Sequence, residues 1–221
     1  MYCVILGDIV DSRNINDDVR NKIKRSALNT FDQLNKVYSD KLMAPFGLVR
    51  GDAFEGVLLT QHDAPQIVQD IIKAFYRTYK TIVRICVVLD ELTVTGYDRN
   101  EVDGPAFYKA LDNLDKLKKN GSNHWLQVSF DVGLYGKSLV DSNLSLLSAL
   151  TEHWTDRQRE TAWIYEEHGN SQKSVSEILG VASSVVNKQL KAAKYDVYRQ
   201  AWNSLTEYLT MIDEYTVIQK L

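Results

Sequence analysis

Residues 171–190 read SQKSVSEILGVASSVVNKQL, and this stretch predicts two short helices joined by a tight turn. Glycine adopts the positive φ angles of a tight turn without a steric cost, so Gly180 marks the turn. Apolar residues recur at helical spacing on both sides of Gly180, and they are Val175, Ile178, Leu179, Val186 and Leu190. The stretch therefore predicts a helix-turn-helix, in which the second helix is the one that enters the major groove of DNA.

The outward face of the second predicted helix is polar and basic. Asparagine can read base edges, lysine can neutralise phosphates, and a serine at the start can cap the helix where its N–H groups face a phosphate. The expected DNA contacts are Ser183, Ser184, Asn187, Lys188, Lys191 and Lys194. Between residues 171 and 203 five basic residues stand against two acidic ones, although the whole chain carries a net charge of -3. This local excess favours double-stranded DNA as a partner, and the alternative is a helical packing motif that binds no DNA.

A helix is predicted on each side of this pair. The first spans residues 156–167, with Ala162, Trp163 and Ile164 as packing residues. The second is long and has an apolar seam formed by Tyr195, Tyr198, Trp202, Leu205, Leu209 and Ile212. Such a seam packs either on the core of its own chain or on the same helix of a second subunit. Because dimeric helix-turn-helix proteins bind half-sites about one turn of DNA apart, we expect a homodimer, and own-core packing is the alternative.

The first 135 residues alternate between strand-like and helical patterns in the order β-α-β-β-α-β-α-β. Apolar runs predict strands at residues 2–6, 83–89 and 125–132 and a β-hairpin within residues 46–59. Apolar residues at helical spacing predict a first helix that Asn16 or Asp17 caps and that carries apolar residues from Val19 to Val37, and further helices at residues 64–79 and 105–118.

From Ser138 onward no strand pattern of useful length remains, so we expect an α+β fold with two domains. The predicted α/β domain spans residues 1–136, and the predicted helical domain spans residues 137–221, with the helix-turn-helix at about 155–194. None of the apolar runs is long enough for a membrane span or a signal peptide, so we expect a cytoplasmic protein with no membrane contact. Cys3 and Cys86 lie in strand-like runs without metal-ligand spacing, which indicates small core residues in a reducing compartment.

Two Gly-Asp pairs suggest an acidic site in the predicted α/β domain. Asp8 follows the first strand, and Asp52 lies at the predicted hairpin turn. If these strands are neighbours, the two carboxylates converge and repel each other unless a cation lies between them. Mg²⁺ binds one or two carboxylates together with substrate phosphates, so we expect Mg²⁺ at Asp8 and Asp52, with Arg50 and Gly51 as phosphate contacts. The alternative is ordinary turn chemistry and a surface ion pair.

The segments GDIVDSR (residues 7–13) and GDAFEGVL (residues 51–58) resemble the two metal-binding segments of class III nucleotidyl cyclases and GGDEF diguanylate cyclases. VRICVVLDELT (residues 83–93), followed by DGPAFYKALDNL (residues 103–114), resembles a further cyclase stretch. Residues 154–190 resemble the helix-turn-helix of sigma-factor region four and of response regulators. The complete arrangement resembles the SatD family. The resemblance implies a ferredoxin-like, cyclase-like βαββαβ domain followed by an all-α helix-turn-helix domain.

The sequence departs from the cyclase pattern where cyclase chemistry is performed. Alignment on Gly51 and Asp52 places Leu48 where cyclases have a purine-recognising lysine. Alignment on Gly104 places Tyr108 and Asp112 where cyclases have the asparagine and arginine that stabilise the transition state. These departures favour a protein without cyclase activity, and the sequence leaves open whether the chain is an enzyme.

The sequence thus favours a DNA-binding transcriptional regulator whose cyclase-like domain senses a nucleotide, a cyclic nucleotide or another second messenger. One alternative is a metal-dependent nucleotidyl- or phosphoryl-transfer enzyme with an accessory DNA-binding domain. The other is an N-terminal domain that serves only as an oligomerisation scaffold.

Overall fold

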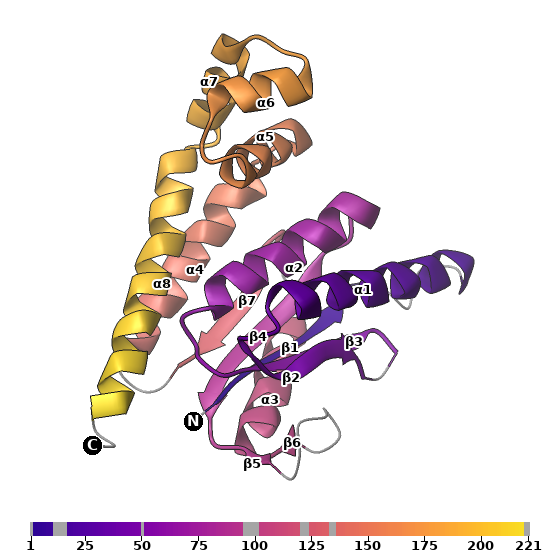
Figure 1. The fold of residues 1–221 in the computed structure, drawn as a ribbon, viewed down its shortest axis with the longest axis vertical. Helices are drawn as coiled ribbons and strands as arrows, with labels where there is room; N and C mark the ends of the chain where they lie inside the picture. The colour runs from indigo at the N-terminus through magenta and orange to yellow at the C-terminus, as the bar shows by residue number, and fades with distance from the viewer. Residues whose placement is uncertain are drawn as a thin grey trace.

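The computed structural model describes residues 2–10, 17–49, 51–94, 102–119, 124–132 and 136–218. These residues form strands and helices that are labelled in Figure 1. The strands are β1 (Tyr2–Ile9), β2 (Leu42–Leu48), β3 (Ala53–Leu58), β4 (Val83–Asp90), β5 (Thr93–Val94), β6 (Val102–Asp103) and β7 (Gln127–Asp131). The helices are α1 (Asp17–Val37), α2 (Ala64–Tyr79), α3 (Pro105–Lys119), α4 (Lys137–Glu152), α5 (Asp156–Glu167), α6 (Gln172–Leu179), α7 (Ser183–Ala192) and α8 (Tyr195–Ile218).

The strand β1 lies at the centre of a five-stranded sheet with the order β2-β3-β1-β4-β7. It pairs antiparallel with β3 and β4, β2 pairs antiparallel with β3, and β7 pairs parallel with β4. Because both faces of a central strand are covered, its sequence YCVILGDI is largely apolar without alternation. The short strands β5 and β6 form a separate two-stranded ribbon. The chain therefore combines a mixed sheet with helices, and the prediction of a chain with both α and β structure is confirmed at that level.

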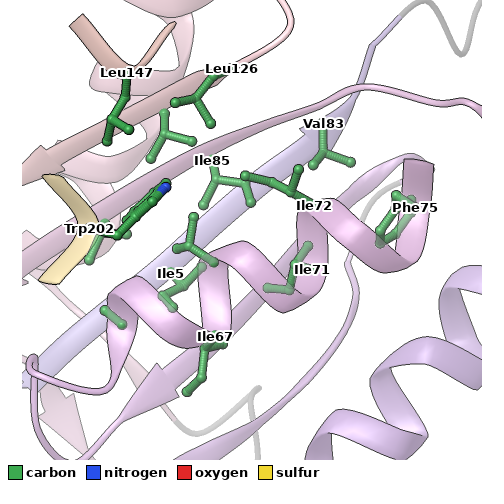
Figure 2. Packing of buried hydrophobic residues seen from close by; sticks show 14 of the residues in the cluster. Ile5, Ile67, Ile71, Ile72, Phe75, Val83, Ile85, Leu126, Leu147 and Trp202 are labelled. Atoms are coloured by element: carbon green, nitrogen blue, oxygen red, sulfur yellow. The ribbon is translucent and has the colours of Figure 1, made fainter. Parts of the chain in front are cut away.

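Helices cover both faces of the five-stranded sheet. On one face α2 buries a stripe of apolar residues that includes Ile67, Ile71 and Phe75, which pack with Ile5 of β1 and Ile85 of β4 (Figure 2). On the other face α3 covers a smaller cluster. Alternate β1 residues point to opposite faces, so this second cluster contains Val4 and Leu6 of β1, Cys86 and Val88 of β4, and Ala106, Ala110 and Leu114 of α3.

The long helix α8 lies beside α4, and α5, α6 and α7 form a group at one end of this pair (Figure 1). Five of the six seam residues of α8, from Tyr195 to Leu209, are buried, and Ile212 packs against the same cluster. The seam therefore packs on the core of its own chain, and the argument for a homodimer that rested on this seam loses its support. The homodimer itself stays a prediction, as does the domain boundary at residue 136, across which the large buried cluster is continuous.

Two predicted helices, α2 and α5, have the bounds that their sequence patterns indicate. The strand β2 begins at Leu42, before the predicted hairpin region, because Pro45 does not interrupt the strand. This residue is exposed on an edge strand, and the register with β3 shifts around it.

Two local predictions about α6 and α7 are wrong. Ile178 was expected on the apolar face, but it is 51% exposed, because the buried side of an eight-residue helix is narrow and Val175 fills it. The N-cap of α7 is Ala182, not Ser183 or Ser184, and no side chain caps this helix.

Candidate DNA-binding surface and acidic site

The helices α6 and α7 are joined by a three-residue turn. Gly180 ends α6 with a φ of 62°, the left-handed conformation that favours glycine. The Val181 N–H donates to the Ser176 carbonyl at 3.1 Å, and the Ser176 hydroxyl donates to the Val181 carbonyl at 2.6 Å. These hydrogen bonds fix the turn and, with it, the angle between the two helices.

The small core of this helix pair is shared with α5. Val175 of α6 and Val186 and Leu190 of α7 are buried, and so are Ala162 and Ile164 of α5. A capping box at Thr155 and Gln158 starts α5, and a turn from His168 to Asn170 ends it. The three helices contact one another and form one compact unit, which presents the other side of α7 to solvent.

The outward face of α7 collects the predicted DNA contacts. Ser183, Ser184, Lys188, Lys191 and Lys194 are exposed, and Asn187 is half-buried. Within the described part of the chain, none of the three lysines forms an ion pair with a carboxylate, and the nearby Glu177 pairs with Lys173 at 4.0 Å. Because Ala182 is the N-cap, neither serine hydroxyl caps the helix. The face therefore presents unpaired positive charge and free hydroxyl groups to an external partner.

The structure places Asp8 in a different environment from the one its sequence suggests. Asp8 is only 5% exposed and lies on the sheet face that α3 covers. Its Oδ2 atom is 2.9 Å from Nζ of Lys118 on α3, and its Oδ1 atom is 3.5 Å from Nη1 of Arg84, the residue directly opposite on β4. Two cations of the chain therefore already face this carboxylate.

The backbone of Asp52 lies beside the end of β1, where the Ile9 N–H donates to the Asp52 carbonyl at 3.2 Å. Asp8 therefore lies in β1, and Asp52 lies in the turn just before β3, the strand that pairs with β1. Gly51 is exposed in the turn and has a φ of 67°. Arg50 lies outside the described residues.

The described residues do not fit a bound Mg²⁺. In the ranges that the structure describes, no group of three or more His, Cys, Asp or Glu side chains is placed to hold a metal ion. The Asp8 carboxylate is buried against Lys118 and Arg84, and a divalent cation on the same oxygens would meet two positive charges. Asp8 and Asp52 therefore remain together in space, but their surroundings are not those of a metal site.

The residues at the other cyclase positions, Leu48, Tyr108 and Asp112, carry no positive charge. Tyr108 and Asp112 are exposed on α3, where Tyr108 donates to Asp103 at 3.2 Å and Asp112 pairs with Lys116 at 2.5 Å. Leu48 is half-buried at the end of β2. None of these three side chains supplies a positive charge to a substrate phosphate.

Sequence reasoning missed Arg84 and Lys118. Arg84 had a signal, since a charged residue inside the apolar run VRICVVL needs a buried partner. Lys118 had none, because it is one of several lysines near the end of α3. Cys86 lies on the same sheet face, and burial, followed by the nearby Asp8 charge, raises the pKa of its thiol to about 12. Both cysteines are buried free thiols, which agrees with their predicted role as small core residues.

Charged pairs connect α2, which covers one face of the sheet, to α5, on which α6 and α7 pack. Lys73 on α2 pairs with Glu166 on α5 at 2.7 Å, and both side chains are largely buried. One turn further along α2, Arg77 pairs with Glu167 at 2.6 Å. At the start of α5, Arg159 is buried and donates to the carbonyls of Trp154 and Thr151, and burial lowers the pKa of its guanidinium. The two ion pairs hold α5 against α2, and Arg159 joins the start of α5 to the end of α4.

The described helices include none that combines the length and the apolar character needed to cross a membrane. No curated protein matches this chain. The chain is similar to a crystal structure of a regulator of polyketide synthase expression from Bifidobacterium adolescentis, with 10% identity over 94% of this chain and 80% of that one. The TM-score is 0.28, which is too low to support an argument about fold or function. The SatD family matches residues 2–209, and the chain belongs to this family.

Proposed function

We propose that this protein is a transcriptional regulator that binds double-stranded DNA through α7. The observation that carries the proposal is the exposed row of Lys188, Lys191 and Lys194 on the second helix of a tightly turned pair, unpaired within the described chain. In a protein with a net charge of -3, such a row marks a local site for a polyanion.

In this proposal α7 lies in the major groove. Its uncapped N-terminus, with Ser183 and Ser184, faces a phosphate, because the first N–H groups of a helix attract anions. Asn187 reads a base edge, and the lysines that follow it neutralise phosphates along the backbone. The helix pair α5 and α6 sets the angle at which α7 is presented.

The test is the salt dependence of binding to a mixed-sequence duplex, followed by selection of a preferred sequence from a duplex library. Lys188→Ala and Lys191→Ala should each lower the slope of log affinity against log salt by about 0.9, the value for one lost phosphate contact. Asn187→Ala should keep the slope and relax base preference. Lys36→Ala, an exposed lysine on α1, is the matched control and should change neither. Absence of salt-sensitive binding by the wild type, or identical binding by all variants, would refute the proposal.

We also propose that the part of the chain before α4 senses a nucleotide or another second messenger. The antiparallel order β2-β3-β1-β4, with α1 and α2 on one face, supports a ferredoxin-like, cyclase-like arrangement. The pairs Lys73–Glu166 and Arg77–Glu167 supply a route, since a ligand that shifts α2 would also shift α5 and the helices packed on it.

The sensing proposal is tested by thermal unfolding of the full chain with nucleoside triphosphates, cyclic nucleotides and cyclic dinucleotides. A ligand at 100 times its Kd should stabilise the protein by about 2.7 kcal/mol. The ligand should also change DNA affinity, and Arg77→Ala should weaken that change while leaving ligand binding intact. Steady turnover of a nucleoside triphosphate that Asp52→Asn abolishes would replace the sensor with an enzyme.

The homodimer remains part of the proposal, because two copies of α7 about one DNA turn apart would fit paired half-sites. Its contact must use a surface other than the buried seam of α8. Light scattering on the purified chain, with and without DNA, measures the stoichiometry directly.

A further inference from the structure

At the position that the cyclase resemblance gives to a divalent cation, two positive side chains of the chain itself face the carboxylate. Asp8 is the residue that the segment GDIVDSR aligns with a metal ligand. In the structure its two carboxylate oxygens face Lys118 and Arg84, at 2.9 Å and 3.5 Å. We propose that Lys118 and Arg84 take the electrostatic place of the divalent cation, so that this domain folds and works without a metal.

Both cations are held there by the fold. Arg84 is the β4 partner of Asp8 in the antiparallel register with β1, so the sheet itself places it beside the carboxylate. Lys118 lies in the last turn of α3, the helix that covers this face of the sheet. A buried carboxylate needs a counter-charge, and these two elements supply it as soon as the sheet and α3 pack together.

The charges also count against simultaneous metal binding. Lys118, which also lies 3.9 Å from Asp115, and Arg84 already place two positive charges against the Asp8 oxygens, so a divalent cation on the same oxygens would be repelled by both. Mg²⁺ requires oxygens at about 2.0–2.1 Å, and the Asp8 Oδ2 atom is already in contact with an ammonium group. The described residues near Asp8 offer no group of three or more side chains that would compensate.

The first test measures metal binding by the full-length wild type. Thermal unfolding in EDTA and in millimolar Mg²⁺ should give the same Tm, and Mn²⁺ electron paramagnetic resonance should show no binding that Asp8→Asn removes. A Tm that rises with Mg²⁺ in the wild type and does not rise in Asp8→Asn would overturn the proposal.

The second test measures the role of Lys118. Lys118→Met should lower the Tm by about 3–6 °C, because it leaves Asp8 with one weaker partner. The control is Lys119→Met, the next residue of α3, which is exposed like Lys118 but pairs with no carboxylate among the described residues, so this variant should melt with the wild type. A Lys118→Met protein that also melts with the wild type would contradict the proposal.

If Lys118→Met does not fold, Lys118→Arg gives the answer. This variant keeps the positive charge and should melt near the wild type. If Lys118→Arg does not fold either, the shape of the side chain matters rather than its charge, and the proposal is overturned. DNA binding is measured on all variants as well. Loss of DNA binding in every protein, including the wild type, would refute the DNA proposal and leave this one standing.

Discussion

The site at Asp8 and the outward face of α7 are both groups of charged residues that the sequence singles out, yet the structure treats them in opposite ways. Asp8 is buried, and Lys118 and Arg84 neutralise it from within the chain. Lys188 and Lys191 are exposed, and no described carboxylate pairs with them. A charged residue that already has an internal partner must give up that contact, at a cost in free energy, before it binds an external one. The comparison therefore favours the basic face of α7 as the binding surface and weakens the case for a metal at Asp8.

The same exchange of lysine for glutamate should have different effects in these two places. At the closed site, Lys118→Glu puts a second negative charge beside the buried carboxylate of Asp8 and should destabilise the protein by about 3 kcal/mol. Urea unfolding measures this loss. Lys119→Glu on the same helix is the control and should cost less than about 1 kcal/mol. Equal stability of the two variants would show that pairing with Asp8 does not make Lys118 more important for stability than its neighbour Lys119.

At the open surface, the double variant Lys188→Glu, Lys191→Glu should fold normally and lose DNA binding. Two phosphate contacts are replaced by repulsion, so affinity for a mixed-sequence duplex should fall by about 100-fold at low salt, and the salt slope should fall by about 1.8. Fluorescence anisotropy measures both quantities. The Tm should stay within about 2 °C of the wild type, since surface substitutions without partners rarely change stability. A large fall in Tm would mean that these lysines have internal partners.

The contrast between closed and open positions extends to apolar residues of α6. Val175→Ala should destabilise the protein by about 2 kcal/mol, because Val175 is fully buried in the core shared with α5. Ile178→Ala should change stability by less than about 0.5 kcal/mol, because Ile178 is 51% exposed. Denaturant unfolding of both variants gives the comparison. If Ile178→Ala destabilises the protein as much as Val175→Ala, Ile178 lies on the buried face of α6, as the sequence pattern indicates.

The smallest expected effect is a pH dependence at the contact between α2 and α5. Hydrogen bonds from the Tyr76 hydroxyl and Lys80 hold the pKa of Asp156 below its ordinary value of 3.8. Because the pKa is lower in the folded chain, the carboxylate stabilises the fold above the unfolded value and loses this effect as the pH falls through the folded value. Asp156 is exposed, so the contribution should be under about 1 kcal/mol.

Unfolding of the wild type and Asp156→Asn at several pH values measures this effect. The wild type should be more stable than Asp156→Asn at about pH 5, and this difference in the free energy of unfolding should narrow below pH 3.8. A difference that widens as the pH falls would give the opposite sign and refute the assignment.

Local patterns predicted what local physics controls. The apolar spacing of α2 and the packing residues of α5 indicate both helices with their observed bounds, because each pattern acts within a few residues of chain. Gly180 indicates the turn between α6 and α7, because few other residues adopt its φ of 62°. The outward set from Ser183 to Lys194 follows from the same helical periodicity.

The remaining features depend on packing between segments that are far apart in the chain. The seam of α8 is equally suited to a second subunit or to its own core, and only the assembled sheet and α4 select the core. The partners of Asp8 are 76 and 110 residues away, so no local pattern connects them with it. The sequence by itself determined the helices, the turn and the identity of the charged residues, because these follow from backbone preference and spacing. Only the tertiary structure decided which charges are neutralised and which remain open, because a counter-charge acts across a few ångströms of space whatever its distance along the chain.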